Sequence, residues 1–74
     1  MKLIPLQSSC LAGAGYDSQR HLLEIKFVND GMYDYLDVPA GIGQGLFHAE
    51  SHGAYFNEHI RDRYRFVVIR KPRK

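Results

Sequence analysis

The sequence lacks the residues that would make a disulfide, a cysteine-rich metal site or a membrane segment. Its 74 residues include one cysteine, Cys10, and no tryptophan. A single cysteine can form no internal disulfide, so packing alone must hold the fold. No apolar run approaches the roughly 20 residues that cross a bilayer, and Met1 to Pro5 lack the pattern of a signal peptide. We therefore expect a cytoplasmic protein without a membrane segment.

Acidic residues are scarce at one end of the chain, which the net charge of +2 conceals. Residues 1–60 hold three basic and seven acidic residues, whereas residues 61–74 hold seven basic residues and Asp62 as the single acid. Clustered charge acts on a partner where scattered charge cancels, so this end predicts attraction to phosphate or to an acidic protein surface. A solvated basic tail that aids solubility is the alternative reading.

The length and composition fit one small globular domain. Hydrophobic residues make up 45% and charged residues 24% of the chain, far from the composition of disordered proteins. We find no internal repeat and no linker. We expect a single domain over residues 1–69 and a basic C-terminal tail over residues 70–74.

Alternating apolar and polar residues predict a central hairpin with flanking strands. Residues 21–28, HLLEIKFV, alternate with the period of a strand, and so do residues 32–38, MYDYLDV. The Asn-Asp-Gly between them is a strong hairpin signal. Residues 10–17, CLAGAGYD, predict a strand that its glycines make pliable or bulged, and residues 64–69, YRFVVI, predict a closing strand.

The turn of this hairpin decides which face Tyr33 and Tyr35 occupy. If Asp30 and Gly31 form a two-residue turn, both tyrosines lie opposite the charged side chains of the partner strand and are displayed. If Asn-Asp-Gly forms a three-residue loop with Gly31 in the left-handed region, Phe27 pairs with Tyr33 and both tyrosines join the apolar face. We favour the three-residue loop, because a small domain needs that apolar patch.

The segment after Pro39 predicts one or two helices. Apolar residues from Leu46 to Tyr64 recur at spacings of three and four, and Ser51 can cap a second helix. Three glycines in residues 40–47, AGIGQGLF, disfavour the first helix by about 1 kcal/mol each, so we expect a flexible turn there.

These elements predict an α+β fold. A small antiparallel sheet, made of the central hairpin 21–38 and flanking strands, packs against one or two helices. The apolar face of the hairpin should meet a helix that contains Phe56 and Ile60.

Residue types suited to catalysis or cofactor binding are present without the spacing that such sites need. The glycines of GIGQG match neither a dinucleotide fingerprint nor a P-loop. His48 and His52 share a face only if one helix runs through Ser51 and Gly53, and no acidic or cysteine ligand is placed to complete a metal site with them or with His59. Cys10 fits a small buried residue of a strand better than a nucleophile. We therefore predict no metal, no cofactor and no enzymatic activity.

Several short motifs together resemble the KTSC domain family, a small module named for the C-terminus of some lysyl-tRNA synthetases. They are the Tyr-x-Tyr of Tyr33 and Tyr35, the Asp-Val-Pro of residues 37–39, and the stretch 51–60, SHGAYFNEHI. The resemblance covers roughly residues 8–66 and implies a stand-alone domain with a small α+β fold and a role in RNA binding. The sequence departs from the family pattern at the glycines of residues 40–47.

The C-terminal segment mixes basic and aromatic residues, the composition of single-stranded nucleic-acid binders. We predict a non-enzymatic module that binds RNA or another single-stranded nucleic acid. The alternative is a protein-interaction module that docks through an acidic partner surface on a larger machine, such as RNA polymerase or a synthetase, and regulates it. In either role the predicted binding residues are Tyr33, Tyr35, Arg61, Arg63, Tyr64, Arg65, Arg70, Lys71, Arg73 and Lys74. In the alternative without a binding role, Tyr64 and Phe66 belong to the core and the arginines line an exposed sheet edge.

Overall fold

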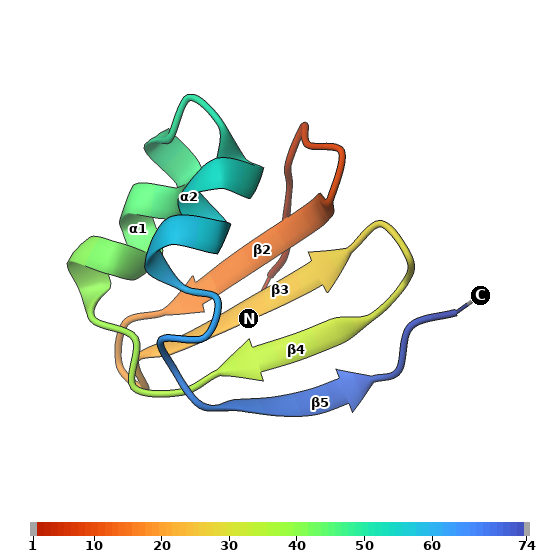
Figure 1. Cartoon of the computed structure of the whole chain (residues 1–74). Coiled ribbons are helices and arrows are strands. Elements are labelled where there is room, and N and C mark those ends of the chain that lie inside the picture. The colour runs from red at the N-terminus through yellow and green to blue at the C-terminus, as the bar shows by residue number, and fades with distance from the viewer. Residues whose placement is uncertain (1, 74) are drawn as a thin grey trace.

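The strands follow one another across a single five-stranded sheet in sequence order, each antiparallel to the next (Figure 1). The computed structural model describes residues 2–73. Both helices lie between the fourth and fifth strands in the sequence, and the α+β fold is as predicted. The elements are β1 (Ile4–Pro5), β2 (Leu11–Asp17), β3 (Leu22–Phe27), β4 (Met32–Tyr35), α1 (Ala40–His48), α2 (His52–His59) and β5 (Phe66–Arg70).

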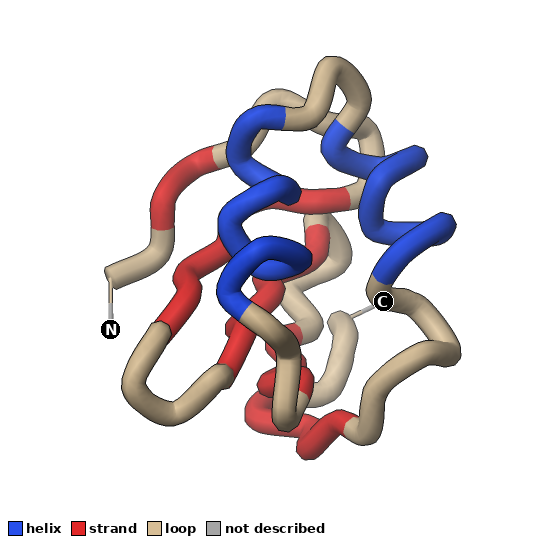
Figure 2. The backbone as a smooth tube through the Cα atoms, turned by 90° about the vertical axis from the view of Figure 1, so that its left-hand side faces the viewer, coloured by secondary structure: helices blue, strands red, loops and turns tan. Residues whose placement is uncertain are grey.

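The two helices pack on one face of the sheet, which we call the near face. Figures 1 and 2 show α1 and α2 on the same side of the sheet, with β5 at the edge away from them. Every residue of β5 is exposed. Within residues 2–73, neither helix is long and apolar enough to cross a membrane. The helices thus leave the near face of β5 largely uncovered.

The core lies between the near face and the helices. The ring of Phe56 in α2 lies 5.5 Å from that of Phe27 and 5.6 Å from that of Tyr35, edge to face in both pairs. These contacts confirm the predicted packing of the hairpin against this helix. Each fully buried apolar side chain contributes about 1.5–3 kcal/mol. The buried core consists of Leu11, Ala14, Leu23, Ile25, Tyr35, Val38, Leu46, Phe56 and Ile60.

The tyrosines of β4 lie on the near face, as predicted. Tyr33 pairs with Ile25 and Tyr35 with Leu23, and both partners are fully buried. Tyr35 is 6% exposed, whereas Tyr33 is half-buried. The two-residue turn that would have displayed both tyrosines beside the charged residues of β3 is therefore wrong.

The hairpin loop starts one residue earlier than predicted. The Asp30 N–H donates to the Phe27 carbonyl at 3.0 Å, and the Phe27 N–H donates to the Gly31 carbonyl at 2.8 Å, which leaves residues 28–30 as the loop. Asp30 adopts the left-handed conformation, with φ of 72°, in place of Gly31. Phe27 therefore does not pair with Tyr33. The register shifts by two residues, and the tyrosines keep their face because side chains alternate with a period of two.

Contacts around the loop explain this shift. The Asn29 side-chain oxygen accepts a hydrogen bond from the Gly31 N–H at 3.0 Å, an arrangement that asparagine favours in turns. The Asn29 carbonyl accepts from the Arg73 N–H at 2.7 Å. A Cβ on Gly31 would lie 3.1 Å from the ring of Pro72. The residues near Arg73 thus fold back on the loop, and Pro72 can pack there because Gly31 has no side chain.

β4 ends before the predicted limit at Val38. Its last residue is Tyr35, because Asp37 adopts a φ of 57° and turns the chain toward α1. The Val38 N–H then donates to the His21 carbonyl at 2.8 Å, and the Val38 side chain is buried in the core. At the other end of the sheet, β5 includes Arg70, the first residue of the predicted tail.

The first helix forms in spite of its glycines, so the expected flexible turn at residues 40–47 is wrong. A Cβ on Gly43 would lie 2.4 Å from the ring of Tyr16 in β2, and one on Gly45 would lie 2.4 Å from the Tyr55 hydroxyl in α2. The missing side chains let α1 approach both elements closely. The propensity cost of glycine is offset by contacts that a larger residue would block.

His48 and His52 lie in two separate helices, as predicted. α1 ends at His48 and α2 begins at His52, with Ser51 as the N-cap. The Ser51 hydroxyl accepts a hydrogen bond from the Ala54 N–H at 3.2 Å, which confirms the predicted cap. His48 and His52 therefore do not share a face of one continuous helix.

The face of the sheet opposite the helices is polar. Glu24 pairs with Asp34 and Lys26 with Met32, and all four are half-buried, as expected for the face opposite the tyrosines. Burial, hydrogen bonding to Asp34 and the charge of Asp34 raise the pKa of Glu24. Two carboxylates directly opposite each other make this part of the face unfavourable for a polyanion.

Two glycines of α1 give opposite predictions for the same substitution. We expect Gly43→Ala to destabilise the protein by about 1–3 kcal/mol, because the new methyl group overlaps Tyr16. Gly41 has open space around it, so Gly41→Ala should leave stability unchanged or raise it by up to about 1 kcal/mol. Urea unfolding of the two variants checks this. Equal stabilities would show that α1 does not depend on close approach at Gly43.

Candidate nucleic-acid interface

The near face of β4 and β5 is lined with aromatic rings. Tyr35 pairs with Phe66 and Tyr33 with Val68, so these side chains point to the same side of the sheet. The Phe66 ring lies 5.2 Å from that of Tyr33 and 5.6 Å from that of Tyr35. Phe66 is 51% exposed. The helices therefore leave an accessible aromatic surface at this end of the sheet.

A hollow of about 360 Å³ opens over these rings, and we call it the aromatic hollow. Its volume falls within the range of about 300–1,000 Å³ that is usual for ligand sites. Aromatic and polar side chains occupy it together, which suits a flat ligand with a polar edge. The lining residues are Phe27, Asn29, Tyr33, Tyr35, Arg61, Asp62 and Phe66.

The end of α2 brings the charged pair Arg61 and Asp62 to the hollow. Ile60 is fully buried, and the Arg61 N–H donates to the Phe56 carbonyl at 2.8 Å. Asp62 then adopts the left-handed conformation, with φ of 62°. A buried anchor and a tight turn thus fix two exposed charges beside the aromatic rings.

The electrostatics of Tyr35 confirm that both charges are near. Burial raises the pKa of Tyr35 to about 12, with a further rise from Tyr33. The positive charge of Arg61 lowers the pKa of Tyr35, and the negative charge of Asp62 raises it. Tyr35 is therefore a neutral, buried floor of the hollow, with one charge of each sign within Coulomb range of its hydroxyl.

The structure brings some of the predicted binding residues together and separates others. Tyr33, Tyr35 and Arg61 line the aromatic hollow. Tyr64 is half-buried and packs against the core, as the alternative without a binding role expected, so it is not an exposed platform. The same alternative also placed Phe66 in the core, which is wrong, because Phe66 is 51% exposed. Lys74 lies outside the described residues.

The remaining predicted arginines and lysine flank β5 at both ends. Arg63 donates to the Glu58 carbonyl at 3.2 Å, and Arg65 lies 3.7 Å from the Asp37 carboxylate in an exposed ion pair. At the far end of the strand, the three basic residues that follow Ile69 are all exposed: Arg70, Lys71 and Arg73. The hollow thus lies in a field of positive charge that continues along the edge of the sheet.

Four residues of the hollow were absent from the predicted site. Phe27 and Phe66 could have been found from the period of two, because each shares a face with Tyr33 once the strands are paired. Asn29 and Asp62 gave no such signal. They lie in a loop and a turn, where periodicity does not report which way a side chain points.

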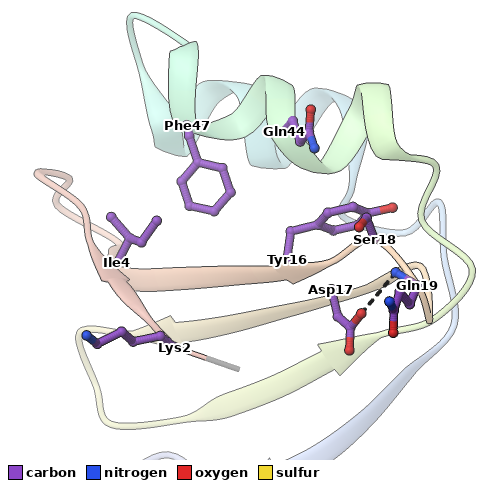
Figure 3. Close-up of a pocket in the computed structure, with 8 residues that line it drawn as sticks. All are labelled: Lys2, Ile4, Tyr16, Asp17, Ser18, Gln19, Gln44 and Phe47. Atoms are coloured by element: carbon purple, nitrogen blue, oxygen red, sulfur yellow. Dashed lines mark hydrogen bonds between the residues drawn. The ribbon is translucent and has the colours of Figure 1, made fainter.

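A second hollow, of about 460 Å³, lies between α1 and the first two strands (Figure 3). Figure 3 shows Phe47 and Gln44 of α1 above Ile4 and Tyr16. The Tyr16 hydroxyl already donates to the Val38 carbonyl at 2.5 Å. Asp17 accepts a hydrogen bond from the Gln19 backbone N–H at 3.0 Å. Two of its polar groups are thus satisfied within the fold, and it has two aromatic rings, Tyr16 and Phe47, where the aromatic hollow has four.

A third hollow, of about 410 Å³, brings Cys10 and His52 to one surface. Cys10 is exposed and precedes β2, so the expectation of a buried cysteine within the strand is wrong. Within residues 2–73, the Cys10 sulfur has a hydrogen-bond partner only in the Ser9 hydroxyl, at 3.9 Å. His52 Nδ1 lies 2.8 Å from the Leu46 carbonyl. The thiol and the imidazole are therefore not arranged as nucleophile and base.

Metal-binding residues do not gather in this part of the chain. No group of three or more histidine, cysteine, aspartate or glutamate side chains among residues 2–73 is placed to hold a metal ion. The aromatic hollow remains the site that combines aromatic rings with charged side chains.

Comparison with known proteins agrees with this architecture. The chain is 39% identical to a protein from Stutzerimonas stutzeri over 70 residues, covering 93% of this chain and 99% of that protein. It is 28% identical over 67 residues to a lysine–tRNA ligase from Nostoc punctiforme, covering 90% of this chain and 12% of the ligase. The crystal structure of a KTSC domain protein from Yersinia pestis matches with a TM-score of 0.89 at 33% identity, covering 93% of this chain and 97% of that one.

The sequence profile of the KTSC domain matches residues 7–64. This span includes the central hairpin, both helices and the turn that contains Arg61 and Asp62. The chain belongs to the KTSC domain family.

Proposed function

We propose that this protein is a non-enzymatic module that binds single-stranded RNA or a related nucleic acid, in the cytoplasm, through the aromatic hollow and the basic residues beside it. One observation supports this above the others: a hollow lined by four aromatic rings lies next to Arg61 on a sheet face that the helices leave open. Stacking of a base on an aromatic ring contributes about 1–3 kcal/mol and works for every base.

The charges around the hollow supply the second part of the interaction. Basic residues on both sides of β5 can neutralise phosphates of a strand that runs along this edge, while its bases turn toward Tyr33 and Phe66. The acidic residues lie mainly in the rest of the chain. A single strand is therefore attracted to this edge and repelled elsewhere.

The name of one relative supports the proposed binding of RNA. The protein from Nostoc punctiforme that contains a similar segment is named a lysine–tRNA ligase. A segment of this kind within a protein that acts on tRNA is consistent with a role in RNA binding.

A second candidate function rests on the outer edge of β5. The strand exposes about half of each apolar side chain from Phe66 to Ile69, and within residues 2–73 no strand pairs with its outer edge. Such an edge can add a strand from another protein. Since Arg65, Arg70 and Lys71 flank it, the fitting partner is an extended segment that alternates apolar and acidic residues, as a docking site on a polymerase or synthetase would provide.

Charge reversal at the end of β5 tests the contribution of phosphate contacts. Each neutralised phosphate of a single strand contributes about −0.7 to the slope of log affinity against log salt concentration. We expect Arg70→Glu with Lys71→Glu to flatten that slope by about 1.4. The measurement is a titration of labelled oligouridine RNA at several salt concentrations. Lys2→Glu with Arg20→Glu is the matched control, because it reverses two exposed bases elsewhere and should leave the slope unchanged.

Removal of the Phe66 ring tests stacking separately from charge. Phe66→Ala should weaken RNA binding by about 1–3 kcal/mol without changing the salt slope. Val67→Ala is the control, because Val67 is 49% exposed but pairs with Asp34 on the opposite face. Equal losses in the two variants would argue against the aromatic hollow as the binding surface.

A peptide titration tests the second candidate function. We expect a labelled peptide of alternating valine and glutamate to bind the protein in a salt-sensitive way, and the same peptide with lysine for glutamate not to bind. Ile69→Lys should lower the affinity of the protein for the acidic peptide, because a charge on an edge strand opposes the addition of another strand. Equal binding of the two peptides, or of neither, would leave β5 without a role in docking.

A further inference from the structure

Asp62 is an exception in its surroundings. It is the single acid among residues 61–74, where seven basic residues favour phosphate, and it lines the aromatic hollow. A carboxylate at a phosphate-binding surface weakens that binding unless it has a contact of its own. We therefore infer that Asp62 makes a contact of its own with a ligand in the hollow.

The backbone does not require an acid at this position. Asp62 has a φ of 62°, a conformation that glycine and asparagine also adopt readily. Arg61 donates to the Asn57 side chain and Arg63 to the Glu58 carbonyl. Among the interactions of residues 2–73, none of the side-chain hydrogen bonds or ion pairs involves the Asp62 carboxylate. Both of its oxygens are free to accept hydrogen bonds from a ligand in the hollow.

The chemistry of a carboxylate beside aromatic rings matches one base. Bases of single-stranded RNA are recognised by stacking on aromatic rings and by hydrogen bonds to their Watson–Crick edges. Guanine presents two adjacent donors on that edge, N1–H and the N2 amine, which fit the two oxygens of a carboxylate. Arginine is the usual donor to the guanine O6 and N7 atoms.

We propose that the aromatic hollow selects guanine, with Asp62 accepting hydrogen bonds from N1–H and N2–H while the base stacks on the exposed ring of Phe66. Arg61, the adjacent residue, also lines the hollow and is a donor of the kind that guanine O6 accepts from. This inference rests on the proposed function, since it names the base that an RNA-binding hollow prefers.

Each of the other bases would place at least one hydrogen-bond acceptor of its Watson–Crick edge against the carboxylate. Adenine and cytosine each place a ring nitrogen lone pair beside their amine, and uracil flanks its single N–H with two carbonyl oxygens. An acceptor held against a carboxylate is repelled and leaves the carboxylate without its second partner. A site built to hydrogen-bond one partner rejects those that lack the matching groups.

The charge pattern at Tyr35 is consistent with this geometry. Arg61 and Asp62 line the same hollow as Tyr35, and their charges act on the pKa of the Tyr35 hydroxyl in opposite directions. A base stacked above Tyr35 would have a donor and an acceptor group at its edge.

The test compares three oligouridine RNAs that differ in one central nucleotide: guanosine, inosine or adenosine. Inosine keeps the N1–H of guanosine and lacks only the N2 amine. We expect the affinity to fall in the order guanosine, inosine, adenosine, with roughly 5- to 150-fold between the first and the last, the range of one bidentate base contact. Fluorescence anisotropy at low salt measures it.

Two variants assign the preference to the carboxylate. Asp62→Asn keeps the left-handed backbone and the side-chain shape but replaces one acceptor with a donor, so it should remove the preference for guanosine and leave binding of plain oligouridine intact. Asp37→Asn is the matched control, because Asp37 is an exposed aspartate with a φ of 57° that does not line the hollow. It should keep the preference. Urea unfolding shows whether Asp62→Asn is folded, and if it is not, the inosine comparison on the wild-type protein decides.

The outcomes separate this inference from the function on which it rests. Equal binding of the three RNAs would overturn guanine selection and leave RNA binding standing. Binding of none of them at low salt would overturn both. A preference for guanosine that survives Asp62→Asn in a folded protein would overturn the role of the carboxylate.

Discussion

The contact of Phe56 with the rings of Phe27 and Tyr35 joins the two layers of this protein. Through it, α2 is held on the hairpin at ring distances of 5.5 and 5.6 Å, and the core of the domain lies around these three side chains. Phe27 and Tyr35 also form part of the aromatic hollow. A chain of 74 residues has few large apolar side chains, so the same side chains form the core and line the candidate site. We therefore expect substitutions at the shared rings to lower stability, whereas Phe66 and Asp62 lie on the exposed side of the hollow.

Much of the fold could be predicted because the relevant signals are local and periodic. The alternation in residues 22–27 fixed both a strand and its buried face, and Ser51 marked the start of α2. The near-face position of Tyr33 and Tyr35 followed from the need of a small domain for apolar area. These predictions depend on residues close together in the sequence, where propensity and pattern act directly.

The predictions that failed depend on contacts between distant residues. α1 forms because Gly43 meets Tyr16, which lies far away in the sequence, and helix propensity does not include such a contact. The hairpin loop moved by one residue where Pro72 and Arg73, from the end of the described chain, pack against Gly31 and Asn29. In the candidate site, Tyr33, Tyr35 and Arg61 could be predicted from motif and composition. Asp62 could not be, because only the turn after α2 brings it to the rings.

The place of β5 in the sequence has a consequence for how the chain folds. Strands β1 to β4 form a meander of neighbouring segments, whereas β5 pairs with β4 only after both helices have been traversed. Contacts of long sequence separation form later than local ones, because a longer loop must be closed first. On a ribosome, β5 also emerges after the other strands of this sheet. During synthesis the outer edge of β4 is therefore a temporary sheet edge, with unpaired backbone groups until β5 pairs with it.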